Sequence, residues 1–351
     1  MTNLFLDKLQ PHTIRIYGLD KENDYIITHI NARELLSFNR FDLFAKLYYI
    51  DKRVCDIVNA KMVYSSHIKA FNPDGKEPGR SDKNNVEDFL ASFEDLIKQF
   101  SICDFDDSKS IIPVDKNNVI LDGAHRVASL AYFNKNVKIV KFNNICAKCN
   151  FDYQYFKNRG LSWAINDEIF LEATKWMNSL FCAVIWPCVK SELIGVTQIN
   201  NKFKIVYERC FDVNFKSLNI IVHEIYKNQD WTKSEKDVRN KSALVYGKSK
   251  RIKLIFFNAN DDLDKILDTK EVIRNEYEMG KHSIHITDSD TETIDLANLF
   301  LSKDGKKIWQ SSLAFKDSFR EKIFRLKKIH FLKLKIVTYK IISYCKKPLF
   351  R

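Results

Sequence analysis

The run from Val119 to Phe133, VILDGAHRVASLAYF, constrains the fold of this chain most strongly. Its β-branched start favours a strand, and the Asp122-Gly123 pair marks a turn. The second half has small and apolar residues at helical spacing. The chain has only nine glycines, so the glycine at this turn marks a position where the backbone is constrained. The run predicts a strand, a tight turn and a helix packed on a sheet, which is typical of an α/β (α+β) fold.

The predicted turn has the properties of a phosphate-binding site. A helix N-terminus offers unpaired N–H donors and partial positive charge, and glycine lets a ligand approach the backbone. His125 and Arg126 follow at once, and arginine can bind phosphate through two parallel hydrogen bonds. Asp122 would repel a phosphate unless it binds a metal, accepts a proton or caps the helix. The alternative is a strand, turn and helix with two exposed polar residues.

The surroundings of DGAHR favour the phosphate interpretation. From Val86 to Phe142 the predicted order is helix, strand, short hairpin, strand, helix and strand. This order around a DGxHR signature resembles the ParB/sulfiredoxin-like superfamily, in particular its DGxHR branch, which includes free-serine kinases. The resemblance implies a nucleotide-phosphate site at Gly123, His125 and Arg126. It is strong over residues 86–142 and weaker over the first 145 residues.

Superfamily activities include phosphoryl transfer to serine or to a sulfinic acid, and nucleotide-dependent DNA clamps and nucleases. Sulfiredoxins place a cysteine beside the His-Arg pair, where this chain has Ala124, so sulfinic-acid repair is not expected. The DNA-partition members continue into a helix-turn-helix domain, whereas this chain continues with alternating helical and strand patterns. The chain also resembles bacterial proteins that carry DGxHR and KHSIHITD-type motifs and accompany capsule and lipopolysaccharide genes.

A polar loop before the motif supplies candidate catalytic residues. The segment FNPDGKEPGRSDK contains Glu77 and Lys83, with His67 shortly before it. A kinase needs a carboxylate to orient or deprotonate the acceptor hydroxyl and cations to offset charge on the transferred group. Glu77 and Asp122 are the candidate bases and Lys83 the candidate cation. A solvated loop is the alternative.

A second polar cluster lies in GKHSIHITDSDTETIDLANLF. Asp288 and Asp290 are candidate ligands for a Mg²⁺ ion that accompanies the nucleotide, because hard carboxylates suit that ion. Ser289 and Glu292 have the spacing of a capping box, so helix capping is the alternative. Cys146 and Cys149 have the spacing of half a zinc site but lack a second pair. No Walker loop or Gly-x-Gly-x-x-Gly motif is present, so the phosphate site depends on DGAHR alone.

The basic charge is concentrated at the C-terminus. Residues 316–351 contain twelve Lys and Arg and two acidic residues, so they carry +10 of the net charge of +12. Apolar residues recur among them at helical spacing, which predicts a basic amphipathic helix. Its partner is an anionic membrane surface, the protein's own body or, less favoured, nucleic acid.

The sequence thus predicts three parts. By the resemblance, residues 1–148 are expected to form a ParB/sulfiredoxin-like nucleotide-phosphate domain; 149–315 are expected to form a second α/β domain and 316–351 the tail helix. No secretory signal and no membrane-spanning run is expected, so we expect a cytoplasmic protein that is peripheral on the inner face of the cell membrane. The expected function is an ATP- and Mg²⁺-dependent phosphotransferase acting on a hydroxyl of a sugar or cell-surface glycan intermediate. The alternatives are a ParB-like DNA-binding protein or nuclease and a non-catalytic phosphate-sensing module.

Overall fold

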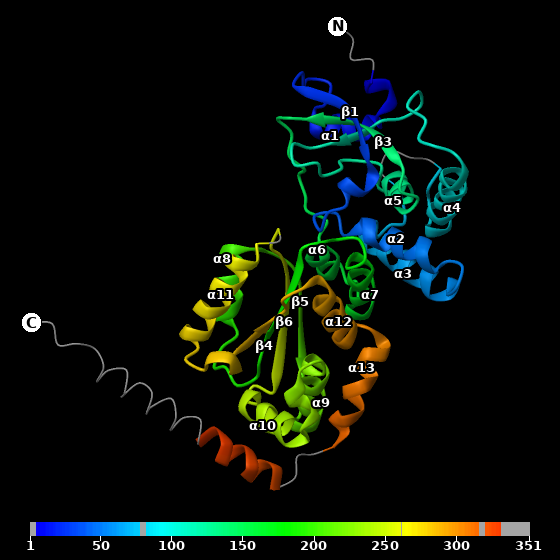
Figure 1. The fold of residues 1–351 in the computed structure, drawn as a ribbon. Coiled ribbons are helices and arrows are strands. Elements are labelled where there is room, and N and C mark those ends of the chain that lie inside the picture. Colours follow the sequence, from blue (N-terminus) through cyan, green and yellow to red (C-terminus); the bar gives the residue numbers. More distant parts are fainter. Residues whose placement is uncertain (1–4, 78–81, 261, 316–319, 331–351) are drawn as a thin grey trace, which may run out of the picture. The chain divides into compact units, whose positions relative to one another are not determined.

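The computed structural model describes residues 5–77, 82–260, 262–315 and 320–330. The chain forms two compact units, residues 1–178 and 179–351. Each unit combines helices with one small sheet (Figure 1). The mixed α/β class expected from the sequence is confirmed.

A three-stranded sheet organises the first unit. The strand order is β1-β3-β2, with β1 (Tyr25–Asn31) antiparallel and β2 (Ile112–Val114) parallel to β3 (Asn136–Phe142). Helix α5 (Ala124–Tyr132) lies between β2 and β3 in the sequence, as a crossover between parallel strands requires. The predicted strand over 119–123 is reduced to one bridge between Val114 and Ile120, so an extended turn precedes α5.

Helices form the rest of the first unit. They are α1 (Pro11–Tyr17), α2 (Asp42–Lys52), α3 (Ile57–Phe71), α4 (Val86–Ile102), α6 (Tyr153–Asn158) and α7 (Trp163–Ala173). The amphipathic face predicted for α4 is observed, because Phe89, Phe93 and Ile97 pack in one cluster with Tyr49 and Tyr64. This cluster joins α2, α3 and α4 beneath the turn that precedes α5.

The first unit extends beyond the boundary expected after residue 148. Helix α7 packs against α2 and α3, and α6 against α3. Phe170 of α7 stacks on Phe38 with ring centres 6.0 Å apart. The change of sequence pattern near 150 is therefore internal to the first unit, and the units divide after residue 178.

In the N-terminal segment, the alternation of Thr13–Leu19 predicts a strand, but these residues largely belong to the helix α1. Pro11 occupies the first helical position, and Gly18 ends the helix in the left-handed conformation with φ of 65°. These two end signals outweigh the β propensity of the residues between them.

The second unit contains a four-stranded antiparallel sheet. The order is β5-β6-β4-β7, formed by β4 (Leu180–Ile185), β5 (Lys204–Asp212), β6 (Arg251–Asn258) and β7 (Ile284–Ile286). Helices α8 (Leu193–Lys202) and α11 (Leu263–Glu276) pack through Ile199, Ile266 and Ile273 on a cluster with residues of β4, β6 and β7. The other helices of the unit are α9 (Phe215–Tyr226), α10 (Glu235–Val245), α12 (Asp290–Leu301) and α13 (Lys303–Gln310) (Figure 1).

The β-prone residues of Ser217–Tyr226 predict a strand, but the segment lies in the helix α9. Asn214 opens the helix through a capping box with Ser217. Leu218, Ile221 and Val222 are buried at helical spacing. Short 3₁₀ helices complete the two units: η1 (Leu6–Lys8), η2 (Ala32–Leu35), η3 (Asp230–Lys233), η4 (Gly280–His282) and η5 (Ser311–Ala314).

Only part of the predicted tail lies within the described residues. Residues 320–330 are helical, whereas 316–319 and 331–351 lie outside the description. Arg325 packs on the rings of Phe215 and Tyr246, 5.0 and 4.5 Å from their centres, so one side of this helix rests on the second unit. Ile323 and Leu326 remain 38% and 67% exposed. Within the described ranges, no helix has the length and hydrophobicity to cross a membrane.

Candidate functional site

The turn predicted from DGAHR has a backbone conformation that favours glycine directly before α5. Gly123 precedes the first residue of α5 in the left-handed conformation, with φ of 86°. A Cβ atom there would lie 2.6 Å from Ile112 Cδ1, so both the backbone angle and the space favour glycine. Asp122 Oδ1 accepts a hydrogen bond from the Gly123 N–H at 2.6 Å, but the side chain does not cap the helix.

The N–H groups that open α5 remain available to a ligand. In the described part of the chain, the backbone N–H groups of Ala124 and His125 donate to no other residue. The first donors of a helix have no partner within it and point along its axis. The N-terminus of α5 is therefore a pair of donors in a positive potential.

These donors face a cleft of about 760 Å³ within the first unit. The cleft brings together all the candidate site residues that the sequence places in this unit: Glu77, Lys83, Asp122, Gly123, His125 and Arg126. The loop before α4 and the turn before α5 thus contribute to one cavity, although 39 residues separate Lys83 from Asp122 in the numbering.

Ion pairs fix the charged groups at the cleft. Lys83 Nζ lies 2.6 Å from Glu77 Oε2 and also 5.1 Å from the ring centre of Phe89. The Arg126 guanidinium contacts Asp122 Oδ2 at 3.5 Å and donates to Ser110 Oγ. Each predicted carboxylate is therefore paired with a predicted cation.

His125 is held by Tyr64. Its Nε2 lies 2.8 Å from Tyr64 Oη, and Tyr64 Oη donates to the carbonyl oxygen of Phe89 at 3.3 Å. Only one proton arrangement satisfies both contacts: the Nε2–H of His125 donates to Tyr64 Oη, which leaves a lone pair on Nδ1. Burial lowers the pKa of His125 well below its ordinary value, and the charges of Lys46 and Lys83 lower it further. His125 is therefore neutral near pH 7, with Nδ1 as a hydrogen-bond acceptor.

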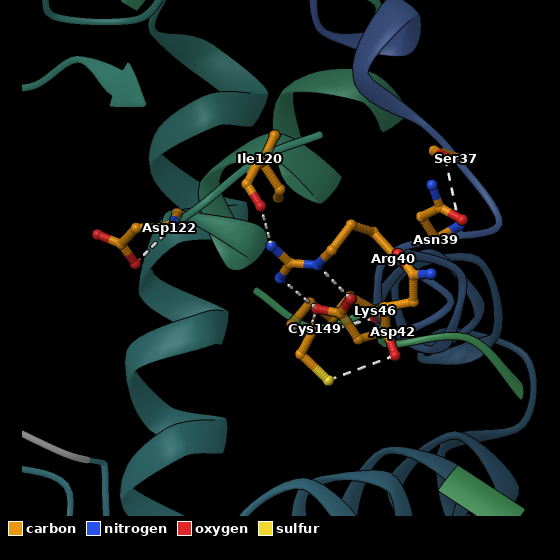
Figure 2. A network of polar contacts seen from close by, with 10 residues as sticks. Ser37, Asn39, Arg40, Asp42, Lys46, Ile120, Asp122 and Cys149 are labelled. Carbon is orange, nitrogen blue, oxygen red and sulfur yellow. Dashed lines mark hydrogen bonds and ion pairs between the residues drawn. The ribbon is translucent and has the colours of Figure 1, made fainter. Parts of the chain in front are cut away.

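The cleft also contains a charged network that was not predicted from the sequence (Figure 2). Arg40 Nε and Nη2 donate to the two carboxylate oxygens of Asp42 at 2.8 and 2.9 Å, and Arg40 Nη1 donates to the Ile120 carbonyl. Lys46 Nζ donates to Asp42 Oδ2 at 3.1 Å. The bond to Ile120 ties α2 to the turn that carries Asp122 and Gly123.

Burial and pairing compete in this network. Burial opposes the charged form of Asp42, but Arg40 and Lys46 outweigh it and hold the pKa of Asp42 far below its ordinary value. Burial also opposes the charge of Arg40, yet Asp42 raises its pKa. For Lys46 burial dominates, and its pKa is lowered despite Asp42. The sequence does contain a signal for this network. Asp42 and Lys46 lie in a helix that is otherwise apolar on all its faces and must therefore be buried, so these two charged residues must be buried with it.

His67 lines the same cleft from α3. Its side chain is fully buried, and neither ring nitrogen has a hydrogen-bond partner in the described part of the chain. Burial lowers the pKa of His67 well below its ordinary value, with a further lowering by Lys46. A buried polar group without a partner is uncommon and points to a missing ligand or water.

The predicted metal ligands lie in the second unit. Asp288 Oδ1 accepts from Lys270 Nζ at 3.0 Å, and Asp290 Oδ1 accepts from the backbone N–H of Leu180 at 3.1 Å. Ser289 caps α12 by accepting from the Glu292 N–H, as the capping alternative predicts. The described residues contain no group of three His, Cys, Asp or Glu side chains placed to hold a metal ion. A metal role for Asp288 and Asp290 stays a prediction.

Comparisons with protein-family models, with curated proteins and with solved structures give no match for this chain.

Proposed function

We propose that the first unit is a ParB/sulfiredoxin-like nucleotide-phosphate domain and that the protein is an ATP-dependent phosphotransferase. The observation that carries the proposal is the opening of α5 into the cleft. There the left-handed Gly123 and the N–H groups of Ala124 and His125 lie in one cavity with Lys83 and Arg126. Oriented N–H donors and nearby cations are the features that bind the phosphates of a nucleotide.

The nucleotide phosphates would accept from the α5 donors and from Arg126. To bind them, Arg126 would exchange its contact with Asp122 for a contact with the phosphate, which carries more negative charge than a carboxylate. Lys83 lines the same cleft and would offset the charge that develops on the transferred group. The bond between the γ-phosphorus and the ADP oxygen breaks as the acceptor oxygen bonds to that phosphorus.

The acceptor hydroxyl would lie against His125 and a carboxylate. The lone pair on His125 Nδ1 suits a hydroxyl proton and does not suit a phosphate oxygen, so His125 orients the acceptor. Asp122 or Glu77 takes the proton as the new bond forms. Both are paired with cations, and both lie within the cleft.

Mg²⁺ fits this arrangement without a preformed cage of ligands. The ion is commonly bound by one or two carboxylates together with the phosphates of the nucleotide, and its charge stabilises the phosphates during transfer. Asp122 is the carboxylate beside the α5 donors and the best candidate for that position.

The acceptor class is proposed from the resemblance to proteins that accompany capsule and lipopolysaccharide genes and from the tail. We propose a hydroxyl of a sugar or cell-surface glycan intermediate at the cytoplasmic membrane face. The helix at 320–330 presents the exposed Ile323 and Leu326 next to Lys322 and Lys327. A helix of this kind suits the interface of an anionic bilayer.

The test is a titration of purified full-length protein with ATP, CTP and GTP in the presence of Mg²⁺, followed by phosphorus NMR for hydrolysis or transfer. Arg126→Ala should abolish turnover, while Arg15→Ala, an exposed arginine of α1, should leave it unchanged. Nucleotide binding without turnover would instead support a phosphate-sensing module. Absence of any nucleotide binding would refute the proposal.

A further inference from the structure

The inner end of the cleft holds more buried positive charge than negative charge. Arg40, Asp42 and Lys46 are 5%, 1% and 3% exposed, and all three line the cleft. Two cations share one carboxylate, so these three residues carry an excess of one positive charge when Lys46 is protonated. The further carboxylates that act on them, Asp122 and Glu77, are each paired with another cation, Arg126 and Lys83. Proteins rarely bury a charge that lacks a counterion. An anion at this position would supply the missing counterion.

The same group has hydrogen-bond donors to spare. Within the described residues, Arg40 uses three of its N–H groups, on Asp42 and Ile120, out of the five that a guanidinium offers. Lys46 Nζ uses two of its three, on the carboxylate and the carbonyl of Asp42. His67 adds a ring whose two nitrogens have no partner there. Three different side chains that line the cleft therefore have unused donors.

These donors are close enough to act on one ligand. Arg40 and Lys46 both bind the Asp42 carboxylate, and His67 lines the same cleft from α3, which packs against the helix that carries Lys46. The ring is neutral, so one nitrogen donates and the other accepts. An oxyanion could accept from His67, Lys46 and Arg40, as carboxylates and phosphates do in charge-assisted hydrogen bonds.

We propose that Arg40, Lys46 and His67 form an inner oxyanion site, and that it binds the acidic group of the phosphotransfer acceptor. This inference rests on the proposed function, in which the opening of α5 takes the nucleotide phosphates. The acceptor is then a hydroxylated acid or a sugar phosphate rather than a neutral sugar. Its carboxylate or phosphate occupies the inner site while its hydroxyl lies near His125.

The experiment measures binding of inorganic phosphate and of glycolate to the full chain by calorimetry, first without nucleotide and then with saturating ADP and Mg²⁺. With ADP and Mg²⁺ occupying the opening of α5, we expect one ion to bind per chain. Without nucleotide, inorganic phosphate also has the opening of α5 available, so the titration with ADP is the one that reports the inner site. The two probes identify the preferred group: tighter phosphate binding indicates a sugar phosphate, and tighter glycolate binding a hydroxylated carboxylic acid.

Three variants locate the site. Lys46→Met leaves Arg40 and Asp42 as a matched pair, so the variant should fold, and it should bind the probe about tenfold more weakly or not at all. His67→Phe keeps a ring of similar shape without its N–H donor and should also weaken binding. Lys61→Met changes an exposed lysine of α3 and should leave the affinity unchanged.

The outcomes separate this inference from the proposed function. Equal affinity in the wild type, Lys46→Met and His67→Phe would overturn the inner site, as would the absence of probe binding in protein that binds ADP. Displacement by ADP of the probe binding that depends on Lys46 would assign the inner site to the nucleotide and overturn the acceptor assignment. If the protein binds no nucleotide but binds the probe in a way that depends on Lys46, the proposed function is refuted and the oxyanion site is supported.

Discussion

Replacing Asp42 by asparagine should strongly destabilise the first unit. The carboxylate is 1% exposed and accepts three hydrogen bonds from cations, two from Arg40 and one from Lys46. Asparagine keeps the shape but loses the charge and one acceptor oxygen, so one bond is lost if the amide oxygen takes the place of Oδ2 and two are lost if it takes the place of Oδ1. At about 1.5–3 kcal/mol for each bond to a charged group, the loss is about 1.5–6 kcal/mol. Breaking a buried ion pair costs about 3–5 kcal/mol by comparison.

The assay is urea denaturation followed by circular dichroism, with hydrogen exchange in α2 as a local report and α12 of the second unit as a reference. Asp230→Asn, which removes a solvent-exposed pair with Lys233, should have no measurable effect. Adding Lys46→Met to Asp42→Asn removes one stranded cation and should recover part of the loss. A destabilisation below about 1 kcal/mol would refute the reasoning, because it would mean that the buried charges of Arg40 and Lys46 do not need the Asp42 carboxylate as a counterion.

The same variant has a defined pH dependence. The pKa of Asp42 is lowered in the folded state, so its contribution is present above the ordinary carboxyl pKa of about 3.9. That contribution is lost as the pH falls towards the lowered value. The difference in free energy of unfolding between wild type and Asp42→Asn should therefore be complete at pH 7 and should become smaller below about pH 4.

Three further outcomes follow from the geometry. Gly123→Ala should lower the free energy of unfolding by about 1–2 kcal/mol and weaken nucleotide binding, because φ is 86° and a Cβ would meet Ile112. Thermal melting and nucleotide titration measure the two effects, and an unchanged affinity would contradict the expectation. The folded-state pKa of His67 is lowered, so the stability of the wild type should fall as the pH drops below about 6.5. His67→Phe should reduce that fall, measured by urea titrations at pH 5 to 8. Equal dependence of stability on pH in the two proteins would count against this. Leu326→Glu should reduce sedimentation with phosphatidylserine vesicles, while the equally apolar exposed Leu263→Glu should not; equal effects would exclude the tail as the contact.

Much of the fold was predictable where pattern and end signals agree. The helix over 86–102 has a strong apolar stripe and an Asn85 cap, and the strands over 136–142 and 251–258 are rich in β-branched and aromatic residues. The errors occur where the two kinds of signal conflict. Thr13–Leu19 and Ser217–Tyr226 have β-prone residues between helix-ending or helix-capping signals, and the caps and tertiary packing decide the outcome.

The site was predictable only in its local part. The sequence identifies the turn at Gly123 because its conformation depends on neighbouring residues. It does not identify the network of Arg40 and Asp42, since the contact of Arg40 with Ile120 joins residues 80 positions apart. Nor can spacing reveal that His67 lacks partners, because burial and hydrogen bonding are properties of the folded chain.

The proposed inner oxyanion site also bears on how long the protein persists in a cell. A ligand held by Arg40, Lys46 and His67 would bind only the folded state, and at a hundred times its dissociation constant it would stabilise that state by about 2.7 kcal/mol. Proteases act on the unfolded fraction, which such a stabilisation reduces about a hundredfold. The abundance of the protein would therefore rise and fall with the supply of its anionic ligand, without any change in its synthesis.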